Sequence, residues 1–525
     1  ETMLADTFNT DAHQVIDHYT YTLAGDGCMM EGVTSEAASL AGHLGLGKLI
    51  ALYDSNSISI EGSTSLAFTE DVAARFEAYG WQVLKGDAYD FKQMQQLIQK
   101  AQKESGKPSL IVLTSIIGKG SPNKAGTHGV HGAALGDDEI VASRAELGIP
   151  ADQDFYIDPK ATEYFAGKQS LWREEFEEWN ETFKAWATAN PKLKAQWDVF
   201  MGEAAPAAVE YPDYETGFSE ASRKVSGAVL QKLADAVPNL VGGSADLAPS
   251  NNTELKNYSH YDRHSRGGRN LHFGVREHAM GGITNGIALH GGLRPFAATF
   301  LVFSDYMRPA VRLAALMKLP VIFIYTHDSI YIGEDGPTHQ PIEQLAALRT
   351  IPGLKVLRPA DPQETVEAWK MAFEYTDGPT ALVLTRQKLS TFEKADAQWR
   401  DSMRTGAYIV KEAKGSSPEV IILATGSEVG MALKAADLSS KRVRVVSVTD
   451  RHAFETMNPA EREQLLPASS RVVVAEAGVS SGWGVYVTTR SDLFTINRFG
   501  ESGPGNEVAA QLGFTAENLA KLCDG

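Results

Sequence analysis

The chain has 525 residues, of which 43% are hydrophobic, and its formal net charge is −17. A chain of this length is expected to form about two to four domains, and its negative field disfavours nucleic acid and anionic membranes as partners. Two cysteines, Cys28 and Cys523, provide no disulfide framework and fit a reducing compartment. Because no apolar run approaches the roughly 18 residues of a spanning helix and no signal peptide opens the chain, we expect a soluble cytoplasmic protein.

The first predicted domain, residues 1–190, alternates strands with helices. Strands are predicted at residues 19–24, 49–53, 81–85 and 109–114, and helices at residues 28–46, 91–104 and 160–186. This alternation is typical of a doubly wound α/β domain with a mainly parallel sheet. Ligands of such a domain are expected at the carboxyl ends of its strands.

Gly25-Asp26-Gly27 lies between the first strand and the next helix, and Asn56 follows the second strand. A tight turn at the three residues would place a diphosphate over a helix N-terminus. Parallel strands bring Asn56 to the same edge of the sheet, where Asp26 and Asn56 would offer the oxygen ligands that magnesium prefers. Gly-Asp-Gly alone is also an ordinary turn, so the prediction of a magnesium and diphosphate site rests on the spacing of the two motifs.

A later loop of this domain carries His128 and His131. Two histidines three residues apart are a partial zinc pattern, but no cysteine or third ligand lies near them in the sequence. Zinc is therefore not expected here.

The rest of the chain is predicted to form two further domains. The Ala/Pro-rich stretch at residues 203–212 indicates a linker, which we bound at residues 191–214. A second α/β domain is predicted at residues 215–395, with strands at 240–242, 271–275, 321–325 and 381–385. A third is predicted at residues 396–525, with strands at 420–425, 443–448 and 472–476 and a helix at 429–438. The predicted fold class is thus α/β, with three doubly wound domains and mainly parallel sheets.

The second domain carries two features suited to holding a flat ring. Glu277 lies where a strand gives way to a helix, and a carboxylate there either favours the helix dipole or protonates a ring nitrogen in a desolvated site. Phe300, Phe303 and Tyr306 recur every three residues and predict one helical face. Such an aromatic stripe is commonly part of a core, but a pyrimidine needs the same kind of surface.

Polar residues in loops that follow strands form a second group. His327, Asp335 and His339 lie in Gly/Pro-rich segments, where a core histidine has little reason to be, so site chemistry is favoured. Three further residues together could hold a phosphate, although the sequence around each one alone favours a surface residue or a cap: Arg223, Ser250 and Arg386.

Taken in order, these segments resemble transketolase, a thiamine diphosphate enzyme, along essentially the whole chain. The resemblance implies that the metal is bound by Asp26, Asn56 and the backbone carbonyl of Ile58. It implies that the cofactor contacts Gly25, Asp26, Gly27, Asn56, Ile58, His131, Asp246, Glu277, Phe300, Phe303 and Tyr306. The implied catalytic residues are Glu277, His131, His327 and His339. The implied substrate contacts are His131, Arg223, Ser250, His327, Asp335, His339 and Arg386.

The implied reaction moves a two-carbon glycolaldehyde unit from a ketose phosphate such as xylulose 5-phosphate to ribose 5-phosphate or erythrose 4-phosphate, in the pentose phosphate pathway. Glu277 would favour the cofactor tautomer whose nitrogen deprotonates the thiazolium, which yields a carbon nucleophile. The metal would be Mg²⁺, with Ca²⁺ or Mn²⁺ as alternatives. A homodimer with its active sites between subunits is implied by the resemblance alone.

The chain departs from the family at its start. Glu1 opens a helical pattern, and the leading part of the family's first domain, with its Gly-rich loop and histidines near the diphosphate, is missing. An active transketolase is therefore weighed against a truncated cofactor-binding subunit with no activity alone.

Two related enzymes are weighed as well. 1-Deoxyxylulose-5-phosphate synthase shares the Gly-Pro-Thr-His core at residues 336–339, whereas the Gly-Val-Arg-Glu-His run at residues 274–278 favours transketolase. Dihydroxyacetone synthase differs mainly in its acceptor, and the predicted phosphate-binding residues argue mildly against it.

Overall fold

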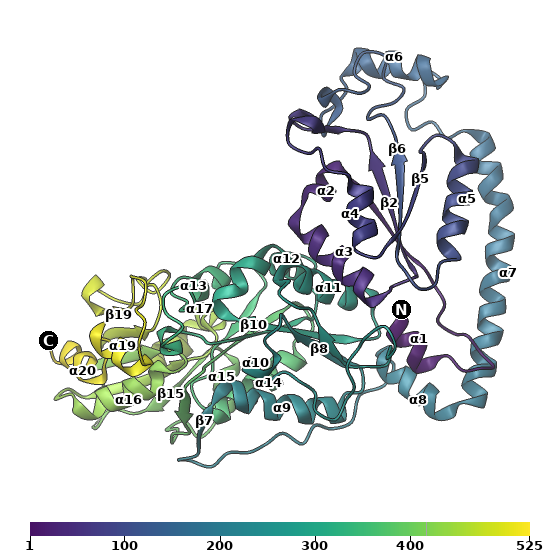
Figure 1. Cartoon of the computed structure of the whole chain (residues 1–525). Coiled ribbons are helices and arrows are strands. Elements are labelled where there is room, and N and C mark those ends of the chain that lie inside the picture. Colours follow the sequence, from purple (N-terminus) through teal and green to yellow (C-terminus); the bar gives the residue numbers. More distant parts are fainter. Residues whose placement is uncertain (416) are drawn as a thin grey trace. The chain divides into compact units, whose positions relative to one another are not determined.

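The computed structural model describes residues 1–415 and 417–525 and separates into two compact units (Figure 1). Unit 1 comprises residues 1–197 and 261–268, and unit 2 comprises residues 198–260 and 269–525. Within the described residues, no helix combines the length and the apolarity that crossing a membrane requires.

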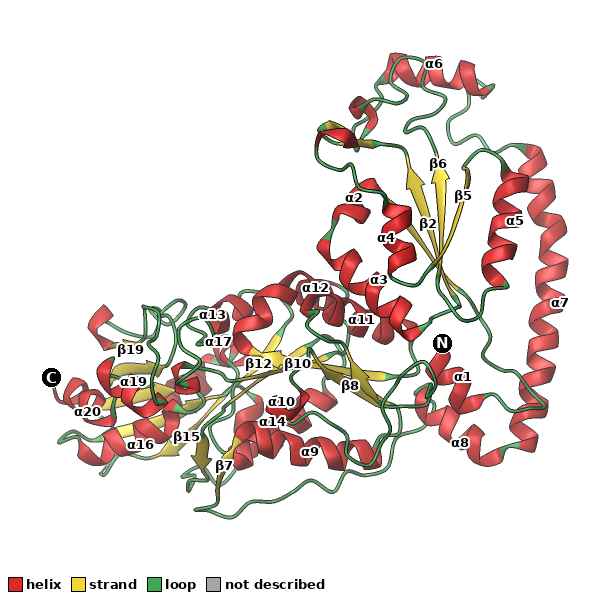
Figure 2. Cartoon of the chain, in the orientation of Figure 1, coloured by secondary structure: helices red, strands yellow, loops and turns green. Residues whose placement is uncertain are grey.

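The sheet of unit 1 has four parallel strands (Figure 2). In spatial order they are β1 (Thr20–Gly25), β2 (Leu49–Ser55), β6 (Ser109–Thr114) and β5 (Gln82–Asp87). Side chains of β2 alternate between the faces: Tyr53 packs with helices α3 (Gly32–Leu44) and α4 (Val72–Ala78), while Ile50 packs with α5 (Phe91–Gln102). Helices therefore cover both faces of the sheet, as the alternation of strands and helices predicts.

An aromatic cluster joins the first helix of unit 1 to its longest one. Phe8 ends α1 (Thr2–Phe8), and its ring centroid lies 6.2 Å from that of Trp186 in α7 (Pro159–Ala189) and 5.1 Å from that of Trp197. The Trp186 indole donates to the Phe8 carbonyl at 2.8 Å. The other elements of this unit are α2 (Asp26–Met30), β3 (Ile58–Ser59), β4 (Gly62–Ser63), η1 (Thr64–Leu66), η2 (His128–Val130) and α6 (Asp137–Leu147).

Part of the segment predicted as a linker is helical. Helix α8 (Pro191–Phe200) occupies the first part of residues 191–214. Residues 201–218 contain neither helix nor strand. The domain and linker bounds stay predictions.

The first sheet of unit 2 has six parallel strands. In spatial order they are β12 (Lys355–Leu357), β13 (Thr380–Leu384), β11 (Ile322–Thr326), β10 (Arg294–Phe300), β8 (Leu240–Ser244) and β9 (Asn270–His272). Every residue of β11 and β13 is buried, because parallel strands covered on both faces form continuous apolar runs. The helices around this sheet are α9 (Ser222–Ala236), α10 (Ala248–Asn251), α11 (Glu277–His290), α12 (Ser304–Leu316), α13 (Gln344–Arg349) and α14 (Pro362–Glu374).

The second sheet of unit 2 has five strands, of which only β15 is antiparallel to its neighbour. Their order is β15 (Ala407–Lys411), β17 (Val443–Val448), β16 (Val420–Ala424), β18 (Arg471–Glu476) and β19 (Leu493–Thr495). The accompanying helices are α15 (Trp399–Arg404), α16 (Glu428–Leu438), α17 (Arg451–Thr456), α18 (Pro459–Leu465), α19 (Gly505–Gln511) and α20 (Ala516–Asp524). Short elements complete the unit: an antiparallel pair of β7 (Ser219–Ala221) with β14 (Lys388–Ser390), and the 3₁₀ turns η3 (Leu301–Phe303), η4 (Ile330–Ile332) and η5 (Arg490–Asp492).

One hydrophobic core joins the two sheets of unit 2. On the side of the six-stranded sheet this core includes Trp369 and Leu382. On the side of the five-stranded sheet it includes Tyr408, Ile422 and Leu519, and all five side chains are fully buried. Burying a large apolar side chain contributes about 1.5–3 kcal/mol, so we expect the two sheets to unfold together.

Candidate active site

Asp26 lies at the carboxyl end of β1, where helix α2 begins. The helix starts directly at Asp26, with Gly25 as its N-cap. The predicted tight turn over Gly25 to Gly27 is therefore wrong in detail. A carboxylate in the first helical turn is favoured by the partial positive charge of the helix N-terminus, so the helix begins one residue into the motif.

The Asp26 carboxylate accepts three hydrogen bonds. Asp26 is 5% exposed, and its Oδ1 accepts from the hydroxyl of Tyr53 at 2.6 Å. Its Oδ2 accepts from the backbone amides of Asn56 and Ser57 at 3.2 and 3.0 Å. Burial, followed by the hydrogen bond to Asp26, raises the pKa of Tyr53, so the phenol keeps its proton. The carboxylate is thus fixed between the ends of two neighbouring strands.

Asn56 shapes the loop beside Asp26. Its Oδ1 accepts from the backbone amide of Ile58 at 3.0 Å, which closes an Asx turn. Ser57 between them has a positive φ of 61°. Asp26, Asn56 and Ile58, the three predicted metal ligands, therefore belong to one hydrogen-bonded loop.

This loop fits a divalent cation that also binds a diphosphate. It offers a carboxylate, an amide and a backbone carbonyl, which are the hard oxygen donors that Mg²⁺ prefers. A Cβ atom on Gly25 or Gly27 would meet no atom within 4 Å, so open space for a phosphate group adjoins both glycines. Among the residues that the structure describes, no three His, Cys, Asp or Glu side chains gather into an all-protein metal site. Phosphate oxygens and water would have to complete the coordination.

His128 and His131 lie in an exposed loop of unit 1. Both histidines are exposed, and the backbone amide of His131 donates to the carbonyl of His128 at 3.0 Å in the turn η2. The role of His131 towards cofactor and substrate stays a prediction.

Glu277 is the first residue of α11 in unit 2 and is 8% exposed. It follows a turn in which Gly274 has a positive φ of 64° and Arg276 donates to the carbonyl of Phe273 at 2.9 Å. A buried carboxylate at a helix start is compatible with both predicted roles, a favourable helix-dipole contact and proton sharing with a ring nitrogen.

The aromatic row of unit 2 does not form one helical face, so that prediction is wrong. Phe300 ends strand β10, Phe303 ends the turn η3 and Tyr306 lies in helix α12. Pairing of β10 with β8 and β11 keeps the chain extended as far as Phe300, which overrides the three-residue period. The rings still form a row: Phe300 and Phe303 are parallel within 6° at 5.9 Å, and Phe303 lies 6.1 Å from Tyr306.

His327 is buried at the end of β11 and stacks on the aromatic row. It is 4% exposed, and its ring centroid lies 3.7 Å from that of Phe300. Its Nδ1 lies 2.8 Å from the Thr326 hydroxyl, which donates to Asn251 Oδ1 at 2.7 Å. The hydroxyl must therefore accept from Nδ1–H, which leaves Nε2 as an acceptor. Burial, followed by the charges of Arg223 and Arg386, lowers the pKa of His327 to about 3, so the ring is neutral.

The three residues predicted to hold a phosphate come from three elements of unit 2. Arg223 lies in α9 and donates to the backbone carbonyl of Ser250 in α10 at 2.5 Å, while Arg386 is exposed just beyond β13. Burial, followed by the charge of Arg386, lowers the pKa of Arg223. The Nε of Arg223 is buried and has no hydrogen-bond partner among the residues that the structure describes. Two guanidinium groups that repel one another, with a donor left over, fit a dianionic ligand.

Three further predicted residues lie in loops of unit 2. His339 is half-buried, with its ring edge-on to Phe303 at 5.5 Å and its Nδ1 2.9 Å from the Thr338 hydroxyl. Asp335 is exposed in the loop before it. Asp246 is exposed after β8 with a positive φ of 60°, a conformation that Asp tolerates better than most residues.

The residues that orient the site are not among those predicted from the sequence. Tyr53 was assigned only to an apolar strand, although it donates to Asp26. Thr326 and Asn251 fix the His327 ring, and neither was singled out. A polar group at the end of a buried strand is the one signal that could have found Tyr53 and Thr326.

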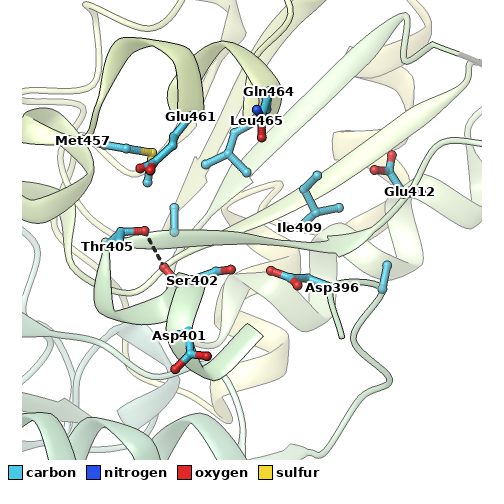
Figure 3. Close-up of a pocket in the computed structure, with 12 residues that line it drawn as sticks. Asp396, Asp401, Ser402, Thr405, Ile409, Glu412, Met457, Glu461, Gln464 and Leu465 are labelled. Atoms are coloured by element: carbon cyan, nitrogen blue, oxygen red, sulfur yellow. Dashed lines mark hydrogen bonds between the residues drawn. The ribbon is translucent and has the colours of Figure 1, made fainter. Parts of the chain in front are cut away.

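An acidic pocket elsewhere in unit 2 does not belong to this site (Figure 3). It has a volume of about 540 Å³, and Asp396, Asp401, Glu412 and Glu461 line it. Glu412 is ion-paired with Arg444 at 3.0 Å. Carboxylates of one sign would repel a sugar phosphate, so the pocket has the opposite character to the surroundings of His327.

Three models of known protein families match most of the chain. The transketolase thiamine diphosphate binding domain matches residues 1–206, the transketolase pyrimidine binding domain matches residues 219–391, and the transketolase-like C-terminal domain matches residues 406–515. The order of these three matches confirms the predicted fold class and favours transketolase over 1-deoxyxylulose-5-phosphate synthase.

Individual proteins that resemble this chain are transketolases as well. The chain is 50% identical to a transketolase of Treponema pallidum and 47% identical to one of Geobacillus stearothermophilus, in each case over 99% of this chain and 79% of the relative. A transketolase structure from Leishmania mexicana superposes with a TM-score of 0.94 at 40% identity, covering 99% of this chain and 78% of that one. A transketolase structure from Pichia stipitis in complex with sedoheptulose 7-phosphate gives 0.92 at 39% identity, with 99% and 78% covered. The chain belongs to the transketolase family and is a transferase with the family's thiamine diphosphate-binding α/β fold.

Proposed function

We propose that this chain transfers a two-carbon glycolaldehyde unit from a ketose phosphate to an aldose phosphate, with thiamine diphosphate as cofactor. The observation that carries the proposal is the arrangement around His327. A neutral imidazole stacks on Phe300 at 3.7 Å, and the charges of Arg223 and Arg386 act on the same ring. A surface for a flat ring thus adjoins a cationic pocket for a phosphate, which is the combination that this reaction needs.

Two sets of residues would hold the cofactor. In unit 1, Asp26, Asn56 and the carbonyl of Ile58 would bind the divalent cation, and Gly25 and Gly27 would leave room for the diphosphate. We propose Mg²⁺, with Ca²⁺ or Mn²⁺ as alternatives that the same oxygen donors accept. In unit 2, Phe300, Phe303 and Tyr306 would pack on the pyrimidine, with Asp246 and Glu277 as its polar contacts.

Thiamine diphosphate, when bound, would supply the carbon nucleophile that two-carbon transfer requires. Glu277 would hold a proton against a ring nitrogen of the cofactor, which its buried position at the start of α11 favours. His327 is neutral, and its Nε2 would accept a hydrogen bond from a hydroxyl of the sugar. His131 and His339 would exchange protons with the hydroxyl and carbonyl oxygens of the donor, because imidazole can both give and take a proton near neutral pH.

The substrates that we propose are phosphorylated sugars. The Pichia stipitis structures include complexes with sedoheptulose 7-phosphate, xylulose 5-phosphate and fructose 6-phosphate. We infer that xylulose 5-phosphate serves as donor here and that ribose 5-phosphate or erythrose 4-phosphate serves as acceptor, in the pentose phosphate pathway. Arg223, Ser250 and Arg386 would bind the phosphate, His327 would contact a hydroxyl of the sugar, and Asp335 would contact a hydroxyl of the acceptor.

We also propose that the enzyme is a homodimer. Large apolar side chains of α11, α12 and the turn after them are exposed: Leu289 (55%), Tyr306 (64%), Leu313 (47%), Leu316 (68%) and Met317 (47%). An exposed apolar surface of this kind is suited to a second copy of the chain.

We retain the proposed domain bounds of residues 1–190, 215–395 and 396–525. The two free cysteines support a reducing compartment, and we propose the cytoplasm.

The proposal is tested by identifying the products. The chain is supplied with Mg²⁺, thiamine diphosphate and either xylulose 5-phosphate with ribose 5-phosphate or pyruvate with glyceraldehyde 3-phosphate. We expect a seven-carbon ketose phosphate from the first pair and no product from the second. A five-carbon deoxyketose from the second pair would instead indicate a 1-deoxyxylulose-5-phosphate synthase, and cofactor binding without any product would indicate a subunit that is inactive alone.

A further inference from the structure

The five-stranded sheet of unit 2 has the kind of crevice in which α/β sheets usually bind a ligand. Strand β17 lies on one side of β16 and β18 on the other, so the chain changes direction across the sheet at β16. Ligands of open parallel sheets lie outside the carboxyl ends of the strands at such a point. Here the residues beyond the end of β16, Thr425 and Gly426, contact a side chain of the other sheet's domain, Arg358, which follows β12.

The side chain of Arg358 lies against the loop that follows β16. It is fully buried, and Nη1 donates to the carbonyl and the hydroxyl of Thr425 at 3.1 and 2.8 Å and also to the carboxylate of Glu428. A Cβ atom on Gly426 would lie 2.7 Å from Nε, so only glycine leaves room for the guanidinium. An internal arginine thus occupies the place of a ligand.

The opposite edge of the guanidinium reaches the candidate active site. Nε and Nη2 of Arg358 donate to Oδ2 of Asp328 at 3.1 and 2.7 Å. Asp328 follows His327 directly, and His327 has a positive φ of 62°. A residue with a side chain rarely adopts this backbone shape unless its surroundings impose it. Arg358 therefore ties the backbone turn at His327 to the loop and helix that follow β16.

We propose that Arg358 is a positioning residue for substrate binding: through Asp328 it holds the His327 turn in the shape that presents Nε2 of the imidazole to a hydroxyl of a sugar phosphate. The inference rests on the proposed function, because it takes His327 to contact that sugar. It also gives the five-stranded sheet a role, since the loop and helix after β16 hold the arginine that pairs with Asp328.

Arg349 provides a matched control for a merely structural ion pair. It is buried and donates from Nη1 to both oxygens of Glu476 at 2.9 and 2.7 Å. Glu476 accepts from Thr425 at 2.8 Å, so both arginines belong to one network. The carboxylate that Arg349 pairs with belongs to β18, whereas Arg358 pairs with the residue next to His327.

The test is calorimetric titration of the full chain with ribose 5-phosphate, with thermal unfolding recorded for every variant. Arg358→Lys keeps the charge but loses the two-sided geometry, and Asp328→Asn removes the anchor while Arg358 keeps Glu428. We expect each to weaken ribose 5-phosphate binding about tenfold, because a small displacement of a binding group costs affinity steeply. Arg349→Lys should lower the unfolding temperature by about as much as Arg358→Lys does, and it should leave the affinity for ribose 5-phosphate unchanged.

A double-mutant cycle separates positioning from general destabilisation. In a His327→Gln background, Arg358→Lys should cause no further loss of affinity, because the group that it positions is gone. The inference is overturned if Arg358→Lys and Asp328→Asn fold and bind normally, if Arg349→Lys weakens binding equally, or if the losses add in the double variant.

A reference variant separates this inference from the proposed function. Arg223→Ala removes a direct phosphate contact and should abolish binding of ribose 5-phosphate. If it does so while Arg358→Lys binds normally, only the positioning role fails. If Arg223→Ala binds as well as the unaltered chain, or if that chain does not bind ribose 5-phosphate, the proposed phosphate pocket fails and the inference fails with it.

Discussion

The Asp26 loop of unit 1 and the His327 turn of unit 2 are built in opposite ways. Asp26 is held by groups at most 31 residues away in the sequence, from the neighbouring strand and the loop after it. His327 depends on Asn251, through Thr326, on one side and on Arg358, through Asp328, on the other. The first site needs one pair of adjacent strands, whereas the second needs the packing of two sheets.

The two regions also differ in charge. Asp26 offers an anion and neutral oxygens, which suit a cation. His327 is neutral and lies within the fields of Arg223 and Arg386, which suit an anion. The comparison predicts that the two regions bind their ligands independently. A substitution that weakens ligand binding in one region should leave the ligand affinity of the other unchanged.

The largest expected effect comes from Glu277→Gln, which changes chemistry without touching the Asp26 loop. Losing a proton-sharing carboxyl should reduce kcat by about 10³-fold, while magnesium-dependent thiamine diphosphate affinity stays within the error of calorimetry. Glu461→Gln, in the exposed first turn of α18, is the matched control and should be silent. Near-normal turnover of Glu277→Gln would remove this residue from the mechanism.

Asp26→Asn should weaken ligand binding in the first region alone. Magnesium-dependent binding of thiamine diphosphate is expected to weaken by about 100-fold, because the only carboxylate of the loop is lost. Ribose 5-phosphate affinity should not change. Asp54→Asn, an exposed position at the end of β2, controls for local charge. Loss of both affinities in Asp26→Asn would show that the regions are not independent.

Acid should destabilise the second region through His327. Its folded pKa is about 3, below the unfolded value of about 6.5, so the unfolded chain binds a proton first as the pH falls. The contribution of neutral His327 is complete above about pH 6.5 and declines below it by about 1.4 kcal/mol per pH unit, towards pH 3.

Denaturant unfolding at pH 7 and pH 5 measures this slope. His327→Gln cannot bind the proton and should show a correspondingly smaller loss of stability between the two pH values. Arg223, Arg386 and His339 surround the ring and are unchanged in the variant. Equal losses in both proteins would contradict the assignment of the acid sensitivity to His327.

The smallest expected effect concerns Tyr53 in the first region. Tyr53→Phe removes the phenol that donates to Asp26 and should weaken magnesium-dependent thiamine diphosphate binding by about five- to tenfold. The fold should persist, because the ring still packs between α3 and α4. Tyr21→Phe, at an exposed position in β1, is the control. Unchanged affinity in Tyr53→Phe would mean that the amides of Asn56 and Ser57 suffice.

The same contrast explains how much the sequence could predict. Strand β6 and strand β17 were predicted with their observed bounds, because short apolar runs between turn residues identify buried parallel strands. The joint placement of Asp26 and Asn56 followed from the order of two strands. The aromatic row was predicted as a helix because a period of three cannot reveal that strand pairing extends to Phe300.

The groups that orient His327 could not be predicted. Arg358 lies 30 residues beyond Asp328 in the chain, and the partners on its other side lie about 70 residues further on. A lone arginine after a strand resembles any surface arginine until the two sheets are packed together. The resemblance to transketolase supplied the list of site residues, and the structure supplied the contacts that hold some of them.

The central claim is that this chain carries out two-carbon transfer. The most direct measurement supplies xylulose 5-phosphate labelled with ¹³C at C1 and C2, together with ribose 5-phosphate, Mg²⁺ and thiamine diphosphate. We predict label in the first two carbons of a seven-carbon ketose phosphate and none in the three-carbon aldose phosphate. Saturated thiamine diphosphate binding without any labelled seven-carbon product would contradict the account.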